Sequence, residues 1–231
     1  MDNEMFQILV ADDDKEIADL VELYLVSDGY QVCKAYGGKE ALQLFHAKKI
    51  DLAILDIMMP EMDGMQVCKE IRRESTIPII MLSARDGDVD KIGGLRNGAD
   101  DYITKPFNPL ELGARVQSQI RRCTEFNKVA APQGTVMLDN LTIDYETRQV
   151  LAYGKNVKCT PREFDILYMM ASHPGKVFRT DELYEAVWKE KCFEASNTVM
   201  VHIRRLREKI ERNPRKAEII QTVWGVGYKI G

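Results

Sequence analysis

Short apolar runs alternate with amphipathic segments throughout the first half of the chain. The runs have strand length and are rich in Val, Ile, Leu and Ala, whereas the segments between them repeat apolar residues at helical spacing. The expected strand and helix pairs are 6–11 with 16–27, 31–35 with 38–47, 52–56 with 65–73, 77–83 with 89–97, and 102–104 with 109–122. Near-continuous apolar strands separated by helices indicate a parallel sheet covered on both faces. The first half is therefore expected to be a doubly wound α/β domain.

The pattern changes in the second half. Short β-prone pieces fill residues 136–157, helix patterns follow, and residues 219–230 predict a hairpin of two short strands. Thr160, Pro161 and Glu163 together predict a helix start with a capping box. Residues 124–135 lack periodicity and contain Pro and Gly. We expect one domain over 5–122, a linker over 123–135 and an α+β domain over 136–231.

The composition is that of an ordinary water-soluble protein. The chain has 231 residues, of which 45% are hydrophobic and 29% charged, and this length allows two modest domains. No apolar run reaches the roughly 20 residues that a membrane span requires, and the acidic start lacks the layout of a signal peptide. We therefore expect a cytoplasmic location. The five cysteines form no C-x-x-C pair, which argues against a disulfide framework and against a zinc site.

The net charge of −4 conceals an asymmetry between the halves. Residues 1–123 hold 15 Lys and Arg against 22 Asp and Glu, a net charge of −7, whereas residues 124–231 hold 17 against 14, a net charge of +3. The acidic half suits a cation-binding pocket. The basic half suits an anionic partner, although a charge of +3 is weak evidence by itself.

Polar residues end four of the expected strands. Asp12 and Asp13 follow the first run, Asp56 ends the third, Ser83 ends the fourth and Lys105 follows the fifth. Because the carboxyl ends of parallel strands meet at one sheet edge, these side chains should converge there. Carboxylates suit Mg²⁺, and a further carboxylate, a hydroxyl and an ammonium suit the formation and stabilisation of an acyl phosphate. The sequence thus predicts phosphoryl chemistry.

This arrangement resembles the receiver domain of two-component response regulators. The resemblance covers residues 5–122 in order and rests on Asp12-Asp13, Leu55-Asp56, Pro60, Asp63-Gly64, Ser83-Ala84, Gly98-Ala99-Asp100-Asp101-Tyr102 and Lys105-Pro106-Phe107. It implies a CheY-like five-stranded sheet of order 2-1-3-4-5, with a cis peptide bond between Lys105 and Pro106.

The resemblance also implies a role for each pocket residue. Asp56 would accept the phosphoryl group, and Asp12, Asp13, Asp56 and the backbone carbonyl of Met58 would hold Mg²⁺. Ser83 and Lys105 would bind the phosphoryl group, and Ser83 and Tyr102 would reorient as a switch pair.

Charged residues gather around the expected fourth helix, fifth strand and fifth helix. A charged face of this kind is usually only a solvated surface. In similar regulators this face forms an active-state dimer through salt bridges. The resemblance implies Lys91 with Glu111 and Asp101 with Arg115 as the pairs, and the complete expected face is Lys91, Asp100, Asp101, Glu111, Arg115 and Arg122.

The helix expected at 196–212 has a buried stripe on one side and a basic surface on the other. Val199, Ile203, Leu206 and Ile210 recur at helical spacing and should be buried. Thr198, Val201 and Arg205 should point the opposite way, flanked by His202 and Arg204. Arginine can bind guanine bidentately and apolar groups can meet thymine methyls. A solvated basic helix without a DNA role is the alternative interpretation of this helix alone.

The second half resembles the winged helix-turn-helix domain of OmpR/PhoB-type regulators over about residues 136–230. The resemblance rests on Thr160-Pro161-Arg162-Glu163-Phe164, Leu183, Val187-Trp188, Val199, Val201-His202-Ile203-Arg204-Arg205-Leu206-Arg207 and Thr222-Val223-Trp224-Gly225-Val226-Gly227-Tyr228. It implies that the helix at 196–212 enters a major groove and that the hairpin contacts backbone or minor groove. Arg205 is the expected base contact, with Thr198, Val201 and His202 near it, and Arg204, Arg207, Thr222, Tyr228 and Trp188 are expected phosphate or packing residues.

Trp224 departs from the family pattern, because many members carry Arg at this position. Trp cannot supply the charge, so the hairpin is expected to pack along the DNA backbone, or Trp224 is simply structural. Several stretches, including 16–25 and 222–230, are similar to the VanR group.

We therefore expect a transcription regulator, not an enzyme. A sensor histidine kinase would phosphorylate Asp56, the receiver would form a homodimer, and two winged helices would bind direct-repeat sites in double-stranded promoter DNA, with RNA polymerase as a further partner. An aspartyl-phosphate hydrolase would need a second acid two residues after the nucleophile, where this chain has Met58. A flavin-binding protein would need a hydroxyl-rich loop after the first strand, and a DNA-binding protein without a phosphate switch would not need the acidic pocket.

Overall fold

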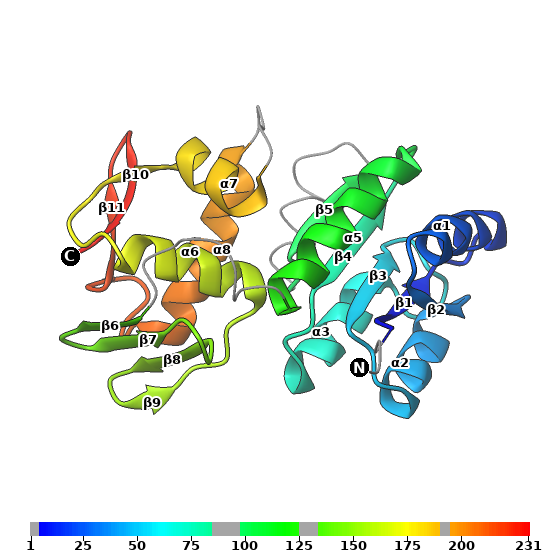
Figure 1. Cartoon of the computed structure of the whole chain (residues 1–231), viewed down its shortest axis with the longest axis horizontal. Helices are drawn as coiled ribbons and strands as arrows, with labels where there is room; N and C mark the ends of the chain where they lie inside the picture. The colour runs from blue at the N-terminus through cyan, green and yellow to red at the C-terminus, as the bar shows by residue number, and fades with distance from the viewer. Residues whose placement is uncertain (1–4, 85–97, 125–133, 190–194) are drawn as a thin grey trace. The chain divides into compact units, whose positions relative to one another are not determined.

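The chain folds into two units, which are described separately (Figure 1). Unit 1 spans Met1–Thr124 and unit 2 spans Glu125–Gly231. The computed structural model describes residues 5–84, 98–124, 134–189 and 195–231.

Unit 1 is a five-stranded parallel sheet with helices on both faces. The strand order is β2-β1-β3-β4-β5, which confirms the expected CheY-like topology. The elements are β1 (Gln7–Ala11), α1 (Lys15–Ser27), β2 (Gln31–Ala35), α2 (Gly38–Ala47), β3 (Leu52–Asp56), α3 (Gly64–Glu74), β4 (Ile79–Ser83), β5 (Asp101–Thr104) and α5 (Pro109–Thr124). The helix expected at 89–97 lies outside the described residues.

Alternate residues of each strand enter two different cores. On one face Leu9, Ala53 and Met81 pack with residues of α2 and α3. On the other face Ile8 and Ile54 pack with residues of α1 and α5. Both faces of the sheet are therefore covered, and the residues that follow the strands lie together along its carboxyl edge.

Helical spacing selects Ile17, Leu20, Val21 and Tyr24 as the apolar side of α1, but the buried face differs from this set. Ala18, Val21 and Leu25 are buried, whereas Leu20 and Tyr24 are exposed. The helix is apolar on two sides, so helical spacing alone does not identify which side meets the sheet.

The described residues of unit 2 form two antiparallel sheets and three helices around one core. Its elements are β6 (Thr135–Leu138), β7 (Leu141–Asp144), β8 (Gln149–Ala152), β9 (Lys155–Asn156), α6 (Pro161–Ala171), β10 (Phe178–Arg179), α7 (Thr180–Trp188), α8 (Ala195–Ile210), β11 (Ile220–Val223) and β12 (Gly227–Ile230). The first sheet has the order β6-β7-β8-β9. The expected terminal hairpin of β11 and β12 is present. It is part of a three-stranded sheet of order β10-β12-β11. The sequence does not predict β10, because a strand of two residues has too few positions to show a pattern.

Side chains stabilise the helix starts that the sequence indicated. The Asp14 carboxylate accepts hydrogen bonds from the backbone N–H groups of Glu16 and Ile17 at the start of α1. Thr160 and Glu163 form the predicted capping box of α6. Such caps satisfy N–H groups that have no partner inside the helix.

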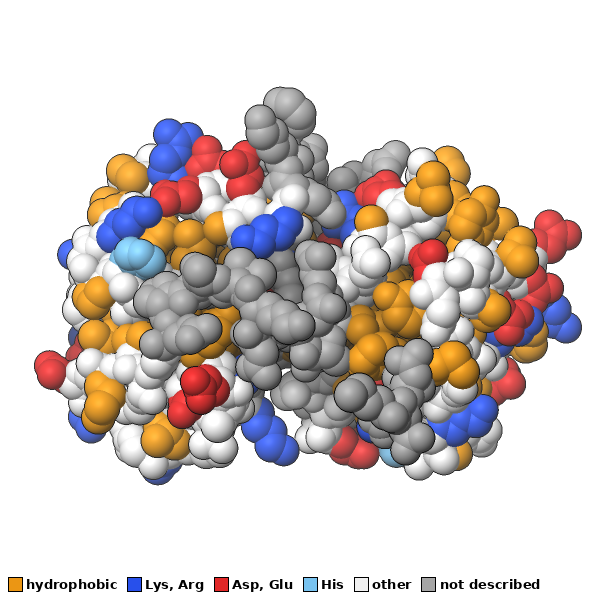
Figure 2. Space-filling model, viewed as in Figure 1, with side chains coloured by type: hydrophobic (Ala, Val, Ile, Leu, Met, Phe, Trp, Pro, Cys, Tyr) orange, Lys and Arg blue, Asp and Glu red, His pale blue; other side chains and the backbone are white. Residues whose placement is uncertain are grey.

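Both units carry charges of either sign on the face drawn in Figure 2, where Lys and Arg side chains are intermixed with Asp and Glu. Within the described ranges, no helix is long and apolar enough to cross a membrane.

Candidate functional site

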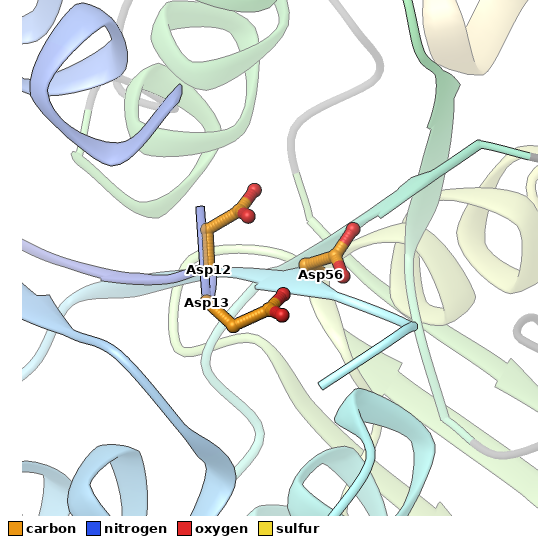
Figure 3. A group of neighbouring side chains, drawn as sticks. All are labelled: Asp12, Asp13 and Asp56. Atoms are coloured by element: carbon orange, nitrogen blue, oxygen red, sulfur yellow. The ribbon is translucent and has the colours of Figure 1, made fainter. Parts of the chain in front are cut away.

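Three carboxylates meet at the carboxyl edge of the parallel sheet. Asp12 and Asp13 follow β1, and Asp56 ends β3, which pairs directly with β1. One oxygen from each lies within 4.8 Å of the others, and the three side chains extend to the same side of the strand ends (Figure 3). Asp12 and Asp56 are buried, whereas Asp13 is exposed. The structure thus brings together the three acids that the sequence selected.

Lys105 bridges the two buried acids. Its Nζ lies 2.6 Å from Asp12 Oδ2 and 2.8 Å from Asp56 Oδ1. The residue directly follows β5, and its peptide bond with Pro106 is cis, as expected. One ammonium therefore partly neutralises two carboxylates within the sheet edge.

The pocket shifts the protonation equilibria of its members. Burial raises the pKa of the Asp12 carboxyl and the negative charge of Asp56 adds to this, while Lys105 opposes both. Burial lowers the pKa of Lys105, but its hydrogen bonds to Asp12 and Asp56 outweigh burial, so this pKa lies above its ordinary value. Lys105 is therefore a cation at neutral pH. Its single positive charge does not fully neutralise the neighbouring carboxylates.

The loop after β3 holds the Asp56 carboxylate from its other side. The backbone N–H of Met58 donates to Asp56 Oδ2 at 2.8 Å. Gly64 opens α3 against this loop, and a Cβ on it would lie 2.1 Å from the backbone oxygen of Asp56. Only glycine allows this approach. Asp56 thus has one oxygen towards Lys105 and the other towards a backbone amide.

The hydroxyl and the tyrosine of the expected switch lie on neighbouring strands. Ser83 ends β4 and is buried, and Tyr102 in β5 is half-buried against the core under α2 and α3. The backbone N–H of Lys105 donates to the Ser83 carbonyl at 2.6 Å. The ends of β4 and β5 are thereby joined beside the carboxylate cluster.

The donor set fits a hard divalent cation. Mg²⁺ prefers oxygen ligands and keeps several waters. Asp12, Asp13 and Asp56 offer three carboxylate oxygens, and the exposed Asp13 leaves one side of the cluster open to solvent. A dication would offset the burial and the negative charge of Asp56, which together raise the pKa of Asp12. The residues present therefore suit the ion that the sequence led us to expect.

Two acidic residues of the expected dimer face contact Arg115 within the chain. The Arg115 guanidinium contacts Asp101 at 3.1 Å and Glu111 at 2.9 Å within the same chain. Lys91 lies outside the described residues, as does the side chain of Arg122.

Asp100 is not a surface residue, which corrects the expectation for this face. Its side chain is fully buried, and Oδ2 accepts from Arg72 Nη2 at 2.6 Å and from the Ile79 N–H at 3.0 Å. Arg72 also donates to the carbonyls of Gly98 and Ile77, at 2.8 and 2.6 Å. Sequence reasoning missed Arg72, because nothing in the local pattern of α3 marks a residue whose partner lies 28 positions away.

The recognition-like helix α8 buries more of its surface than helical spacing predicts. The expected stripe of Val199, Ile203, Leu206 and Ile210 is buried. However, Val201, His202 and Arg205 are also buried, so the prediction that they are exposed is wrong. α8 packs against both α6 and α7, and the His202 ring lies 5.3 Å from the Trp188 ring. Thr198 is half-buried, and Met200, Arg204 and Glu208 are exposed.

Arg207 joins α8 to the terminal hairpin. Its guanidinium donates to the Ile220 carbonyl at 2.8 Å and to Thr222 Oγ1 at 2.8 Å, both on β11. It also lies over the ring of Tyr228 in β12, 5.7 Å from the centroid. Tyr228 is buried, as is Trp188. These residues were expected either to contact DNA phosphates or to pack within the unit. For Arg207, Tyr228 and Trp188 the geometry favours packing.

Comparison with known proteins agrees with both halves of this description. Residues 8–117 match the model of the response regulator receiver domain, and residues 154–230 match that of the transcriptional regulatory protein C terminus. The regulatory protein VanRc of Enterococcus gallinarum is 48% identical over 226 residues, covering 97% of this chain and 98% of the relative. The regulatory protein VanR of Enterococcus faecium has the same identity and coverage.

A solved structure of similar architecture is the response regulator DrrB of Thermotoga maritima, described as an OmpR/PhoB homolog. It is 32% identical, and the match covers 98% of this chain and 99% of DrrB with a TM-score of 0.51. The pocket at the sheet edge, the winged unit and these matches along nearly the whole chain lead to one conclusion: the chain belongs to the OmpR/PhoB family of two-component response regulators, which are DNA-binding transcription regulators.

Proposed function

We propose that phosphorylation of Asp56 controls DNA binding by unit 2. The observation that carries this proposal is the placement of Asp56, a buried carboxylate held between Lys105 Nζ at 2.8 Å and the Met58 N–H at 2.8 Å. The proposed donor is a sensor histidine kinase that carries a phosphohistidine. A carboxylate oxygen of Asp56 attacks phosphorus, the P–N bond breaks, and the imidazole leaves as an acyl phosphate forms.

The surrounding residues have distinct proposed roles in this transfer. Lys105 supplies positive charge to the phosphoryl oxygens, and the Met58 N–H fixes the orientation of the carboxylate. Ser83, at the end of the neighbouring strand, would bind a phosphoryl oxygen, with Tyr102 following its movement. Mg²⁺, held by Asp12, Asp13, Asp56 and the Met58 carbonyl, would supply further charge neutralisation when bound.

α1 offers a surface on which the kinase could dock. Leu20, Leu23 and Val26 are exposed on this helix, with 41%, 67% and 54% of their surfaces accessible. α1 begins at Lys15, two residues after Asp13. A protein that covers these side chains would therefore stand beside the mouth of the carboxylate cluster, as phosphoryl transfer requires.

The output is proposed to be a homodimer on direct-repeat promoter DNA in the cytoplasm, acting with RNA polymerase. Asp101 and Arg115 already form an ion pair within one chain, so dimerisation through these residues would exchange or extend existing pairs. α8 is proposed to enter the major groove, with Arg204 and Thr198 as reachable contacts. Base contact by Arg205 remains part of the proposal and requires this buried side chain to become accessible.

Phosphorylation is tested by mass spectrometry with Mg²⁺ and a small phosphodonor such as acetyl phosphate. We expect the wild-type chain and the exposed-site control Asp28→Asn to gain one phosphoryl group, and Asp56→Asn to gain none. Omission of Mg²⁺ should abolish the gain. Equal labelling of Asp56→Asn and the control would exclude Asp56 as the acceptor.

DNA control is tested by comparing phosphorylated and unphosphorylated chains on duplexes recovered from a random pool. Tighter binding and dimerisation of the phosphorylated chain would support the switch. If the two forms have the same affinity for DNA and the same oligomeric state, the result would favour a DNA-binding protein without a phosphate switch.

A further inference from the structure

The loop between β3 and α3 contains a backbone conformation that side chains rarely adopt. Glu61 has a φ of +65°, and no other non-glycine residue in the described part of unit 1 has a positive φ. Such a conformation has a free-energy cost, and it persists where neighbouring contacts hold the backbone in place. The same loop carries Met58, whose N–H donates to the Asp56 carboxylate at 2.8 Å. The strained residue therefore lies close in the chain to the amide that orients the proposed acceptor.

Both ends of this loop are fixed by local hydrogen bonds. At its base, the Gly64 N–H donates to the Ile57 carbonyl at 3.2 Å. At the start of α3, the Asp63 carboxylate accepts from the Gln66 N–H at 2.7 Å and so caps the helix. The outer part of the loop, around the exposed Glu61, is contacted instead by α2.

The start of α2 meets the loop at two adjacent residues. Gly38 lies so close to Met62 that a Cβ on it would be 2.3 Å from the Met62 carbonyl oxygen. Lys39 Nζ lies 2.8 Å from Glu61 Oε2. Their hydrogen bond raises the pKa of Lys39 and lowers the pKa of Glu61, so both side chains are charged at neutral pH. The backbone contact places α2 against the loop, and the ion pair acts on the strained residue itself.

We propose that Lys39 and Glu61 are positioning residues for the acceptor site. Their ion pair holds Glu61 in its left-handed conformation and thereby holds the loop that places the Met58 N–H on Asp56. This inference rests on the proposed function, in which the carboxylate cluster and the Met58 carbonyl bind Mg²⁺. The two side chains act through Met58 and have no proposed contact with the reacting atoms.

Charge reversal separates this positioning role from a long-range effect of charge. Lys39→Glu and Glu61→Lys each replace the ion pair by two like charges, and the double variant restores a pair of opposite polarity. If the pair positions the loop, both single variants should weaken Mg²⁺ binding about two- to fivefold, and the double variant should recover the wild-type affinity. If only the charge near the carboxylates matters, Lys39→Glu should tighten Mg²⁺ binding, because it adds negative charge.

A second measurement requires no metal. In the metal-free full chain, the Met58 amide should exchange its hydrogen about two- to fivefold faster in both single variants, because its bond to Asp56 is held less firmly. The double variant should exchange at the wild-type rate. The matched control is Arg73→Glu, which breaks the pair with Glu70 in the last turn of α3 and should leave the exchange of Met58 unchanged.

The experiment uses calorimetric titration of the full chain with Mg²⁺ and amide hydrogen exchange measured by NMR. The side chains of Lys39 and Glu61 are 71% and 70% exposed, so the variants are expected to fold, and urea unfolding checks this. Weaker Mg²⁺ binding by both single variants, recovery in the double variant and selective acceleration at Met58 would support the proposal.

Three results would overturn it. Tighter Mg²⁺ binding by Lys39→Glu would show that the pair acts only through its charge. Unchanged exchange of Met58 in both single variants would show that the loop does not depend on the pair. Equal acceleration at Met58 and at the β4 amides would show that the pair stabilises unit 1 as a whole. If the wild-type chain binds no Mg²⁺ but Met58 exchange follows the expected pattern, the proposed metal site fails while the positioning of Asp56 by the pair is supported.

Discussion

Arg72→Ala should destabilise unit 1 severely although Arg72 lies outside the phosphoryl pocket. The substitution leaves the carboxylate of Asp100, which is 0% exposed, without the guanidinium that contacts it at 2.6 Å. Removing one partner of a buried ion pair costs about 3–5 kcal/mol. The carbonyls of Gly98 and Ile77 also lose a donor. Because a domain of this size has roughly 5–15 kcal/mol of unfolding free energy, the loss is a large share of the total.

The neighbouring Arg73 provides a matched control. It pairs only with the exposed Glu70 among the described residues, on the surface of the same helix. Arg73→Ala should therefore lower the unfolding free energy by less than about 1 kcal/mol. Both variants are measured in the full chain by urea unfolding, with hydrogen exchange of β4 amides assigning the effect to unit 1.

A second substitution tests the stated cause. In the Arg72→Ala background, Asp100→Asn removes the unpaired charge and should recover about 1 kcal/mol or more. The reasoning is refuted if Arg72→Ala and Arg73→Ala have equal stability, or if Asp100→Asn destabilises both backgrounds by the same amount.

Three further predictions concern separate parts of the chain. Gly64→Ala should lower the unfolding free energy by about 1–3 kcal/mol and slow phosphorylation of Asp56, because the added Cβ would meet the backbone oxygen of Asp56. The control Gly37→Ala, whose Cβ meets nothing within 4 Å, should have neither effect. Equal effects of the two substitutions would contradict this prediction. Leu23→Glu should slow transfer from the kinase at least tenfold while labelling by acetyl phosphate is unchanged, and parallel slowing would reject α1 as the docking surface. Burial, reinforced by the charge of Glu163, raises the pKa of the Cys159 thiol from 9.0 to about 12, so alkylation mapped by mass spectrometry should stay slow at pH 8–10. Because the unfolded thiol ionises first, this group's stabilising contribution is present below pH 9 and is lost as the pH rises towards 12; rapid alkylation of folded protein at pH 8 would disprove the shift.

The sequence was sufficient where structure depends on local pattern and topology. Parallel strands place the residues that follow them on one edge, so the sequence alone is enough to group Asp12, Asp56 and Lys105. The capping box of Thr160 and Glu163 was equally predictable, because both partners lie within one turn.

Packing between distant elements was beyond the sequence pattern. Asp100 and Asp101 are adjacent and chemically identical, yet only the former meets Arg72, and this depends on where α3 lies. Helical spacing correctly identified one buried side of α8, but it could not show that packing on both α6 and α7 would cover His202 as well.

The contact between Asp12 and Lys105 has a consequence for folding. These residues are 93 positions apart, and both must be placed before the carboxylate cluster has its cation. Long-range contacts of this kind form only after much of the chain has been ordered, because closing the intervening loop has a large entropic penalty. With Asp56 as the proposed acceptor, a nascent or partly unfolded receiver lacks the assembled pocket, so only a chain whose unit 1 has folded would be phosphorylated.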